Sequence, residues 1–201
     1  MKNLVAVLFL TLTLSTSVGF AAEPDEMKMP GMSDEKMAKA MALMMPGENH
    51  RKLDSLVGTF KAKATMWMNE GGPASTSEGT SETKWILDGR FVQQTYKGEL
   101  MGKPFEGMAI IGYDTVAKEY NSIWLDSVAT GIMKSTAQYD DTAKTLTEEG
   151  TFSCPLTGKK DNAYKSVTTI TDSDHYTYEM WHDDVVTGKN YKAMEIAYER
   201  A

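Results

Sequence analysis

The stretch SLVGTFKAKATMWM (residues 55–68) marks the point where a helix-like pattern gives way to a period of two residues. From Gly58 onward, apolar residues at positions 60, 62, 64, 66 and 68 alternate with threonine, lysine and tryptophan. This alternation is typical of an antiparallel strand with one face on a core. Just upstream, residues 50–56 should form a short helical turn whose leucines face the same core. Gly58 is an unusual first residue for a strand, because glycine stabilises strands poorly.

Further strand-like runs follow this stretch, separated by turn residues such as Asp88-Gly89 and Thr187-Gly188. They lie near residues 76–87, 90–99, 105–114, 119–128, 132–139, 145–153, 163–171, 175–183 and 189–199. No gap between runs is long enough for a crossover helix, so neighbouring strands should pair as antiparallel hairpins. A flat meander of about ten strands would leave two open edges, whereas closure removes both. The sequence therefore predicts an all-β, up-and-down antiparallel barrel, with a two-sheet sandwich as the alternative.

The repeated pattern Tyr-Asp-x-x-Ala-Lys supports a series of hairpins. It occurs in YDTVAKEY (113–120) and again in YDDTAKTL (139–146). An aspartate at this position can accept hydrogen bonds from the backbone amides of a tight turn. We therefore interpret Asp114 and Asp140 as turn-forming residues and not as catalytic ones.

Residues 1–21 have the pattern of a secretory signal peptide. Lys2 is followed by an apolar core at residues 4–14, which is too short to span a membrane, and then by the small-x-small sequence Gly19-Phe20-Ala21. We expect cleavage near Ala21 and export, which would leave a periplasmic or secreted protein without a stable membrane anchor. The remaining chain divides into a Met-rich helical segment at 22–49 and a barrel domain at 50–201.

The Met-rich segment contains seven of the 15 methionines of the chain. A helix should begin at Ser33 or Asp34 and stop before Pro46-Gly47, with Met37, Met41, Met44 and Met45 on one face. The stretch before it, MKMPGM, places thioethers at Met27, Met29 and Met32. Thioether sulfur suits Cu(I), so copper binding by these three residues is one hypothesis. Adaptable apolar packing of the methionines is the alternative.

Composition limits the classes of partner. The chain has 28 acidic and 21 basic residues and a formal net charge of −7. Such a balance disfavours nucleic acids and anionic membrane surfaces, both of which are bound through basic patches. Cys154 is the only cysteine, so an internal disulfide is excluded and an apolar core must stabilise the domain.

Six phrases resemble a bacterial domain-of-unknown-function family, DUF1579. They are PGENHRKLDSLVGTF (46–60), ILDGRFV (86–92), GKPFEGMAIIGYD (102–114), WLDS (124–127), PLTGK (155–159) and MEIAYER (194–200). The resemblance implies a lipocalin-like (calycin) barrel and no established activity. It also implies that Gly58 opens the first strand and that Arg200 packs over the aromatic ring at position 60. The family usually has tryptophan there, whereas this chain has Phe60.

Several polar residues interrupt the apolar runs and are candidates to contact a ligand. If they face inward, buried charges need partners, such as Arg90 with Glu106 or Asp126. If they face outward, they are the ordinary polar face of an antiparallel sheet. The candidate ligand-binding residues are Arg90, Gln94, Glu106, Trp124, Asp126 and Glu179.

Histidine chemistry offers a further alternative. His175 and His182 are seven residues apart in one predicted strand, so their side chains point to opposite faces and cannot share a metal ion. By resemblance to nitrobindin-like calycins, His182 is a candidate haem ligand, with His175 as the second choice. The alternative for His182 is an exposed polar residue near a turn, beside Asp183 and Asp184. His50 has no visible partner for metal binding and is better explained by helix capping. No hydrolase elbow, zinc-protease motif or phosphate loop occurs in the sequence.

The sequence therefore predicts non-catalytic binding of a small, largely apolar molecule inside the barrel, with no cofactor required. Haem or copper handling is the alternative, and an enzyme that acts on a small ligand through inward carboxylates is the next.

Overall fold

The computed structural model describes residues 31–201. The expected signal peptide and the candidate copper ligands Met27 and Met29 lie outside the described residues. The expected helix is present as α1 (Asp34–Leu43), and the Lys36 amide donates to the Ser33 hydroxyl at 3.4 Å. Because α1 ends at Leu43, the exposed residues Met44 and Met45 lie beyond it, so the predicted face of four methionines is shorter than expected.

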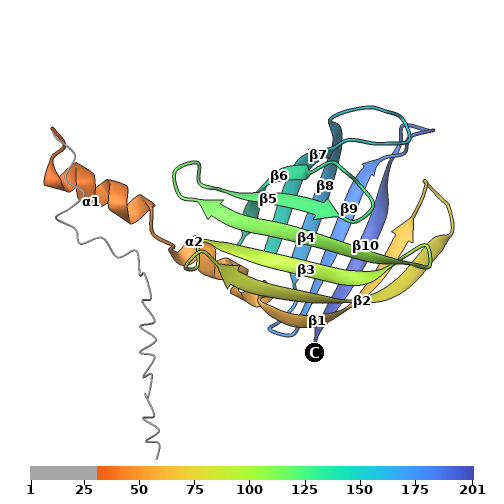
Figure 1. The fold of residues 1–201 in the computed structure, drawn as a ribbon, viewed down its shortest axis with the longest axis horizontal. Helices are drawn as coiled ribbons and strands as arrows, with labels where there is room; N and C mark the ends of the chain where they lie inside the picture. Colours follow the sequence, from red (N-terminus) through yellow and green to blue (C-terminus); the bar gives the residue numbers. More distant parts are fainter. Residues whose placement is uncertain (1–30) are drawn as a thin grey trace, which may run out of the picture. The chain divides into compact units, whose positions relative to one another are not determined.

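Ten antiparallel strands form one closed barrel (Figure 1). They are β1 (Gly58–Trp67), β2 (Ala74–Ile86), β3 (Phe91–Leu100), β4 (Lys103–Asp114), β5 (Glu119–Asp126), β6 (Met133–Asp140), β7 (Thr145–Phe152), β8 (Asn162–Ile170), β9 (His175–Asp183) and β10 (Asn190–Arg200). Each strand pairs with its neighbours in sequence, and β1 pairs with β10. The up-and-down barrel is confirmed and the sandwich alternative is wrong. Cys154 is free and buried in the loop after β7.

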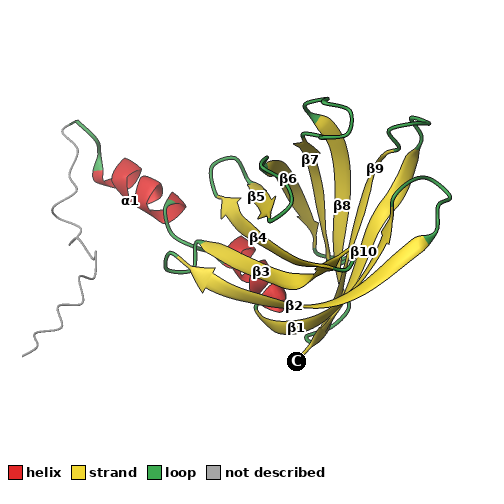
Figure 2. Cartoon of the chain, turned by 45° about the vertical axis from the view of Figure 1, so that its right-hand side comes forward, coloured by secondary structure: helices red, strands yellow, loops and turns green. Residues whose placement is uncertain are grey.

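A short helical segment, α2 (Glu48–Arg51) and the 3₁₀ turn η2 (Lys52–Leu56), covers one end of the barrel. Asp54 accepts a hydrogen bond from the Trp85 indole at 2.9 Å, and Lys52 pairs with Asp141 at 2.8 Å. Leu53 is 1% exposed and belongs to the core. In Figure 2 this segment lies at one end of the barrel, and the loops after β7 and β9 lie at the other.

The seam between the first and last strands centres on Arg200, which is the register partner of Phe60. The guanidinium carbon lies 4.5 Å from the centroid of the Phe60 ring, so the contact expected from the family resemblance is present. Nη1 donates to the Val57 carbonyl at 2.9 Å, and Nη2 donates to the Ser173 carbonyl at 2.7 Å. Gly58 has a φ of +136°, and a Cβ at this position would lie 2.1 Å from Nη1. Glycine therefore begins β1 because the arginine occupies the space of a side chain.

Aspartates organise five of the turns by one arrangement. In each, a single carboxylate oxygen accepts the amides two and three residues further on, at 2.8–2.9 Å. The five residues are Asp114, Asp126, Asp140, Asp172 and Asp184. The predicted turn-forming role of Asp114 and Asp140 is confirmed. Because the amide donors favour the charged form, they hold the pKa of both carboxyl groups below the usual value.

Asp184 differs from the other four aspartates because it also connects its turn to a second turn, and this difference can be tested. It is buried, and its second oxygen accepts the Glu70 amide at 2.9 Å, which ties the β9–β10 turn to the β1–β2 turn. Three backbone amides lower its pKa to about 2. The folded-state pKa is thus below the unfolded value of about 4, so its stabilisation is present above pH 4 and disappears as the pH falls toward 2.

Asp184→Asn should lower the urea midpoint at pH 7, because the amide nitrogen of asparagine cannot accept the Glu70 N–H. The loss should shrink between pH 4 and pH 2, where the wild-type carboxylate takes up its proton. Asp140→Asn is the matched control, since among the described residues Asp140 accepts only its own turn amides. Equal losses in the two variants would contradict a linking role for Asp184.

Candidate functional site

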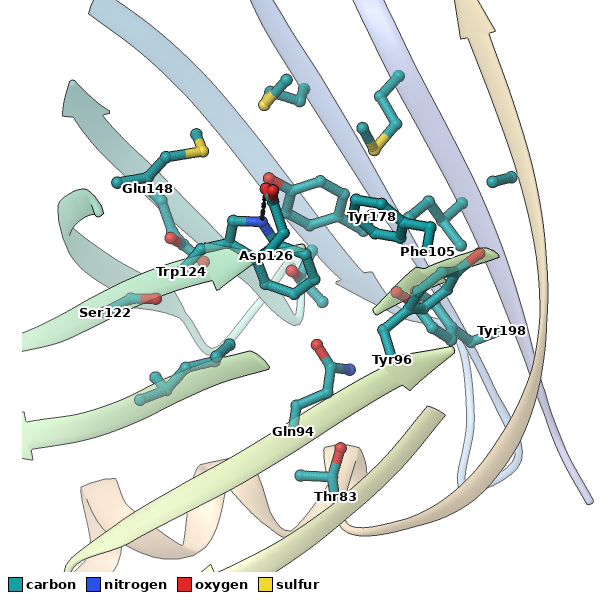
Figure 3. Close-up of a pocket in the computed structure, with 18 of the residues that line it drawn as sticks. Thr83, Gln94, Tyr96, Phe105, Ser122, Trp124, Asp126, Glu148, Tyr178 and Tyr198 are labelled. Carbon is teal, nitrogen blue, oxygen red and sulfur yellow. Dashed lines mark hydrogen bonds between the residues drawn. The ribbon is translucent and has the colours of Figure 1, made fainter. Parts of the chain in front are cut away.

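The interior of the barrel contains a cavity of about 270 Å³. This volume is close to the lower limit of about 300 Å³ for small-molecule pockets. Leu56 of η2 reaches the cavity from the covered end, whereas Met66 and Val128 line it at the opposite end. The wall is mainly apolar and aromatic, and Figure 3 shows many of its side chains. Its aromatic residues are Tyr96, Phe105, Trp124, Tyr164, Tyr176, Tyr178 and Tyr198.

Trp124 is held in the wall by contacts on several sides. Its ring stacks on Phe105, with centroids 6.4 Å apart and an interplanar angle of 22°. The indole N–H donates to Asp126 Oδ2 at 3.0 Å. The ring lies over Gly107 of the neighbouring strand, where an added Cβ would come within 2.1 Å of the indole carbon Cζ2. The glycine and the aspartate together fix the orientation of this ring.

Gln94 supplies a polar group from β3. Its side chain points into the cavity (Figure 3). The amide nitrogen donates to Ser81 Oγ at 3.0 Å and to the Tyr176 hydroxyl at 3.2 Å. Burial raises the pKa of the Tyr176 hydroxyl, so this group stays neutral. With its nitrogen engaged by the wall, Gln94 has its carbonyl oxygen available as an acceptor.

Glu148 of β7 is the most deeply buried charged group in the wall. The residue is 7% exposed, and its Oε2 accepts a hydrogen bond from Ser135 Oγ at 2.6 Å. Burial raises its pKa, and the Ser135 hydroxyl only partly opposes that effect. Tyr178 lies beside both Glu148 and Ser166, but it does not form a hydrogen bond with Ser166. The buried hydroxyl group of Ser166 has no hydrogen-bond partner among the described residues.

The ligand candidates from the sequence divide into two groups. Gln94, Trp124 and Asp126 line the cavity. Arg90, in contrast, lies in the turn after β2, where it donates to the Leu87 carbonyl at 3.3 Å and contacts the Met45 sulfur at 3.9 Å. The expected pairing of Arg90 with Glu106 or Asp126 is therefore wrong.

Glu106 and Glu179 also lie outside the cavity. Glu106 forms an exposed ion pair with Lys97 at 3.2 Å, and Glu179 pairs with Lys192 at 2.9 Å. Successive residues of a strand point to opposite faces. Since Phe105 in β4 and Tyr178 in β9 face the cavity, the glutamate that follows each of them faces outward. Of the two orientations that the sequence left open, these two carboxylates adopt the outward one, so neither lines the cavity as a ligand-binding residue would.

His182, the haem candidate, lies between two aromatic rings and is not part of the cavity lining. Its ring centroid is 5.5 Å from that of Phe152 and 5.0 Å from that of Tyr191, and Nδ1 lies 3.0 Å from the Asp183 carbonyl oxygen. Met32, the one described copper candidate, is 39% exposed and precedes α1. Within residues 31–201, no group of three His, Cys, Asp or Glu side chains is placed to hold a metal ion.

His50 has a structural role at the start of α2. Its Nδ1 accepts the Gly47 backbone N–H at 3.0 Å, which satisfies a donor that the helix leaves free. Burial lowers its pKa, and the nearby positive charge of Arg90 lowers it further. The capping interpretation of this histidine is confirmed.

Sequence reasoning missed most of the cavity wall, including Glu148, Tyr178 and Tyr198. Strand parity was the available signal. Leu146 is fully buried, so alternation places Glu148 on the same inner face of β7. In β10, Ile196 and Tyr198 are related in the same way.

Comparison with known proteins gives a family and a fold. A family model described as "Protein of unknown function (DUF1579)" matches residues 45–200. No curated protein matches the chain. Within the described residues, no helix is both long and apolar enough to cross a membrane.

Two solved structures are similar in fold. Rv2717c from M. tuberculosis has a TM-score of 0.61 at 13% identity, and the match covers 78% of this chain and 99% of that one. The S-type phycobiliprotein lyase CPES from Guillardia theta has a TM-score of 0.54 at 8% identity, with 77% and 93% covered. At such low identity the likeness shows a shared lipocalin-like barrel and nothing about activity.

Proposed function

Because the chain belongs to the family described as protein of unknown function (DUF1579), we propose a function from its cavity: non-catalytic binding of a small, largely apolar molecule inside the barrel. The carrying observation is a mainly apolar cavity of about 270 Å³, with several aromatic side chains in its wall, inside the closed ten-stranded barrel. Cavities that bind small molecules have apolar walls with a few fixed polar groups, which set the orientation of the ligand. Gln94, Asp126 and Glu148 are such groups here.

Asp126 and Gln94 are already held by the protein, which favours binding over chemistry. Asp126 accepts the Trp124 indole and two turn amides, and Gln94 donates to two wall hydroxyls. Groups fixed in this way provide a preorganised surface and lose little freedom when a ligand arrives. Export, copper binding by Met27, Met29 and Met32, and haem binding by His182 stay predictions from the sequence.

Filling the cavity should weaken ligand binding strongly. Ala64 of β1 lines the cavity and is 5% exposed, so Ala64→Trp would place an indole in the ligand space. We expect the wild-type protein to increase the fluorescence of the apolar probe N-phenyl-1-naphthylamine, and the variant to bind the probe at least about tenfold more weakly. Native mass spectrometry of protein from its own host would identify the natural ligand.

The matched control is Ala197→Trp, which adds the same side chain to the exposed outer face of the adjacent strand β10. It should bind the probe as the wild type does. Circular dichroism would establish that both variants keep the barrel. Failure of the wild-type protein to bind the probe, or equal binding by a folded Ala64→Trp variant, would contradict the proposed function.

A further inference from the structure

The ionisable groups of the cavity wall all carry the same sign of charge. The carboxyl groups of Asp126 and Glu148 line the cavity, and no lysine, arginine or histidine is among its described lining residues. A ligand with a carboxylate or phosphate group would meet these acids with no basic partner. A ligand with a positive charge would find opposite charge on the wall and attraction in a medium of low dielectric constant.

Glu148 is the member of this set that most needs a partner. It is 7% exposed, and the only hydrogen bond to its side chain among the described residues comes from the neutral Ser135 hydroxyl, to one of its two oxygens. A buried carboxylate is costly unless a cation or several donors accompany it. Within residues 31–201 no cation pairs with this carboxyl group. A cation on the ligand would therefore offset the free-energy cost of burying the carboxylate.

Aromatic faces provide the second part of a cation site. Trp124, Tyr164 and Tyr178 line the same cavity as Glu148, and Figure 3 shows Trp124 and Tyr178 together with Asp126 and Glu148. Aromatic faces attract organic cations, and desolvated rings do so most strongly. Methionine side chains at Met66, Met133, Met180 and Met194 complete an adaptable apolar wall for the rest of such a molecule.

We propose that the ligand of this cavity is a cationic amphiphile, an apolar molecule that carries an ammonium group, and that Glu148 holds this group. The inference rests on the proposed function and specifies the chemistry of its ligand. It distinguishes the cavity from one for fatty acids, whose carboxylate would need a basic residue in the wall.

The proposal implies that binding depends on pH in a defined direction. The groups that face Glu148 are Ser135, Ser166, Tyr164 and Tyr178, and burial raises the pKa of both tyrosines. Neither tyrosine therefore ionises between pH 5 and 8, whereas burial raises the pKa of the Glu148 carboxyl group above its usual value. A permanent cation should bind more tightly as the pH rises and Glu148 ionises.

Three ligands of equal chain length test the charge preference: octyltrimethylammonium, octanol and octanoate, each measured by displacement of N-phenyl-1-naphthylamine and by calorimetry. We expect the ammonium compound to bind at least about tenfold more tightly than octanol, and octanoate to bind most weakly. Glu148→Gln, which keeps the shape but not the charge, should remove the ammonium preference, so that octyltrimethylammonium and octanol bind this variant with affinities within about threefold of each other.

Glu149→Gln is the matched control, because Glu149 is the exposed neighbour on the outer face of the same strand and its loss changes the net charge equally. Equal affinities for the three ligands, or tightest binding of octanoate, would overturn the proposed ligand class while probe binding still supported the barrel function. Failure of both the three ligands and the probe to bind would overturn the function itself. An ammonium preference that survives in Glu148→Gln would refute the role of Glu148.

Discussion

Arg200→Ala is expected to lower the free energy of unfolding by about 2–4 kcal/mol. The guanidinium donates to the carbonyls of Val57 and Ser173 and packs over the buried ring of Phe60. Alanine would leave two carbonyl groups without these donors and would remove the contact over the ring. The side chain is 33% exposed, so water replaces part of the lost interaction, which sets the upper limit of the range. Urea denaturation followed by circular dichroism would measure the change.

Gly58 provides the internal test of this explanation. Gly58→Ala adds a methyl group where Nη1 of Arg200 lies, and it forces a side chain onto a backbone with a φ of +136°. The two substitutions should therefore be non-additive: with alanine at position 200, Gly58→Ala should cost only its backbone strain of about 1–3 kcal/mol. Arg51→Ala, at an exposed arginine of α2, is the control and should be close to neutral. Additive losses in the double variant would show that the methyl group and the arginine do not compete for space.

Gly107→Ala is expected to affect stability and ligand binding together. An added Cβ at Gly107 would lie 2.1 Å from the Trp124 ring, so the indole must leave its place on the wall. This movement would separate it from Asp126 and Phe105, which now hold it by a hydrogen bond of 3.0 Å and by stacking. We expect a loss of about 1–3 kcal/mol in unfolding free energy, together with at least tenfold weaker probe binding.

Near-ultraviolet circular dichroism would report the changed environment of the indole in Gly107→Ala. The control is Gly131→Ala, because Gly131 lies in the loop after β5 and has no atom within 4 Å of an added Cβ. That variant should be as stable as the wild type or slightly more so, since alanine has less freedom in the unfolded chain. Wild-type stability and probe binding in Gly107→Ala would contradict the close packing of Trp124 on β4.

The sequence was sufficient for the barrel because its signals were regular. Strand-length runs, turn aspartates at fixed offsets and the lack of crossover helices all pointed to one topology. The seam at Gly58, Phe60 and Arg200 followed from family resemblance and not from spacing. Nothing in the local pattern links residues 143 positions apart, as Val57 and Arg200 are.

The direction of the polar side chains was harder to predict, for a physical reason. In β4, Met108 and Ile110 are apolar on the outer face, while Phe105 and Ile111 are apolar on the inner one. The alternation of apolar and polar residues is therefore weak in β4, and the sequence could not show whether the Glu106 side chain faces the cavity or the solvent. In β10 the pairing shifts between Lys192 and Met194, so parity does not carry through the strand. Glu148 was hidden by its neighbour Glu149, because either glutamate could have faced inward.

The seam also sets the order in which a growing chain can complete its fold. Each hairpin from β2 to β9 needs only a neighbour that has just been synthesised, but β1 must wait for β10, the last strand of the barrel to be synthesised. Until Arg200 has emerged, the nascent sheet keeps two unpaired edges, and such edges are prone to pair with other chains. The backbone N–H of Ala201 donates to the Thr59 carbonyl at 2.9 Å, so the residue that follows β10 also takes part in closure. A chain truncated before β10 would lack the strand that pairs with β1, so its sheet would keep open edges and be prone to aggregation and proteolysis.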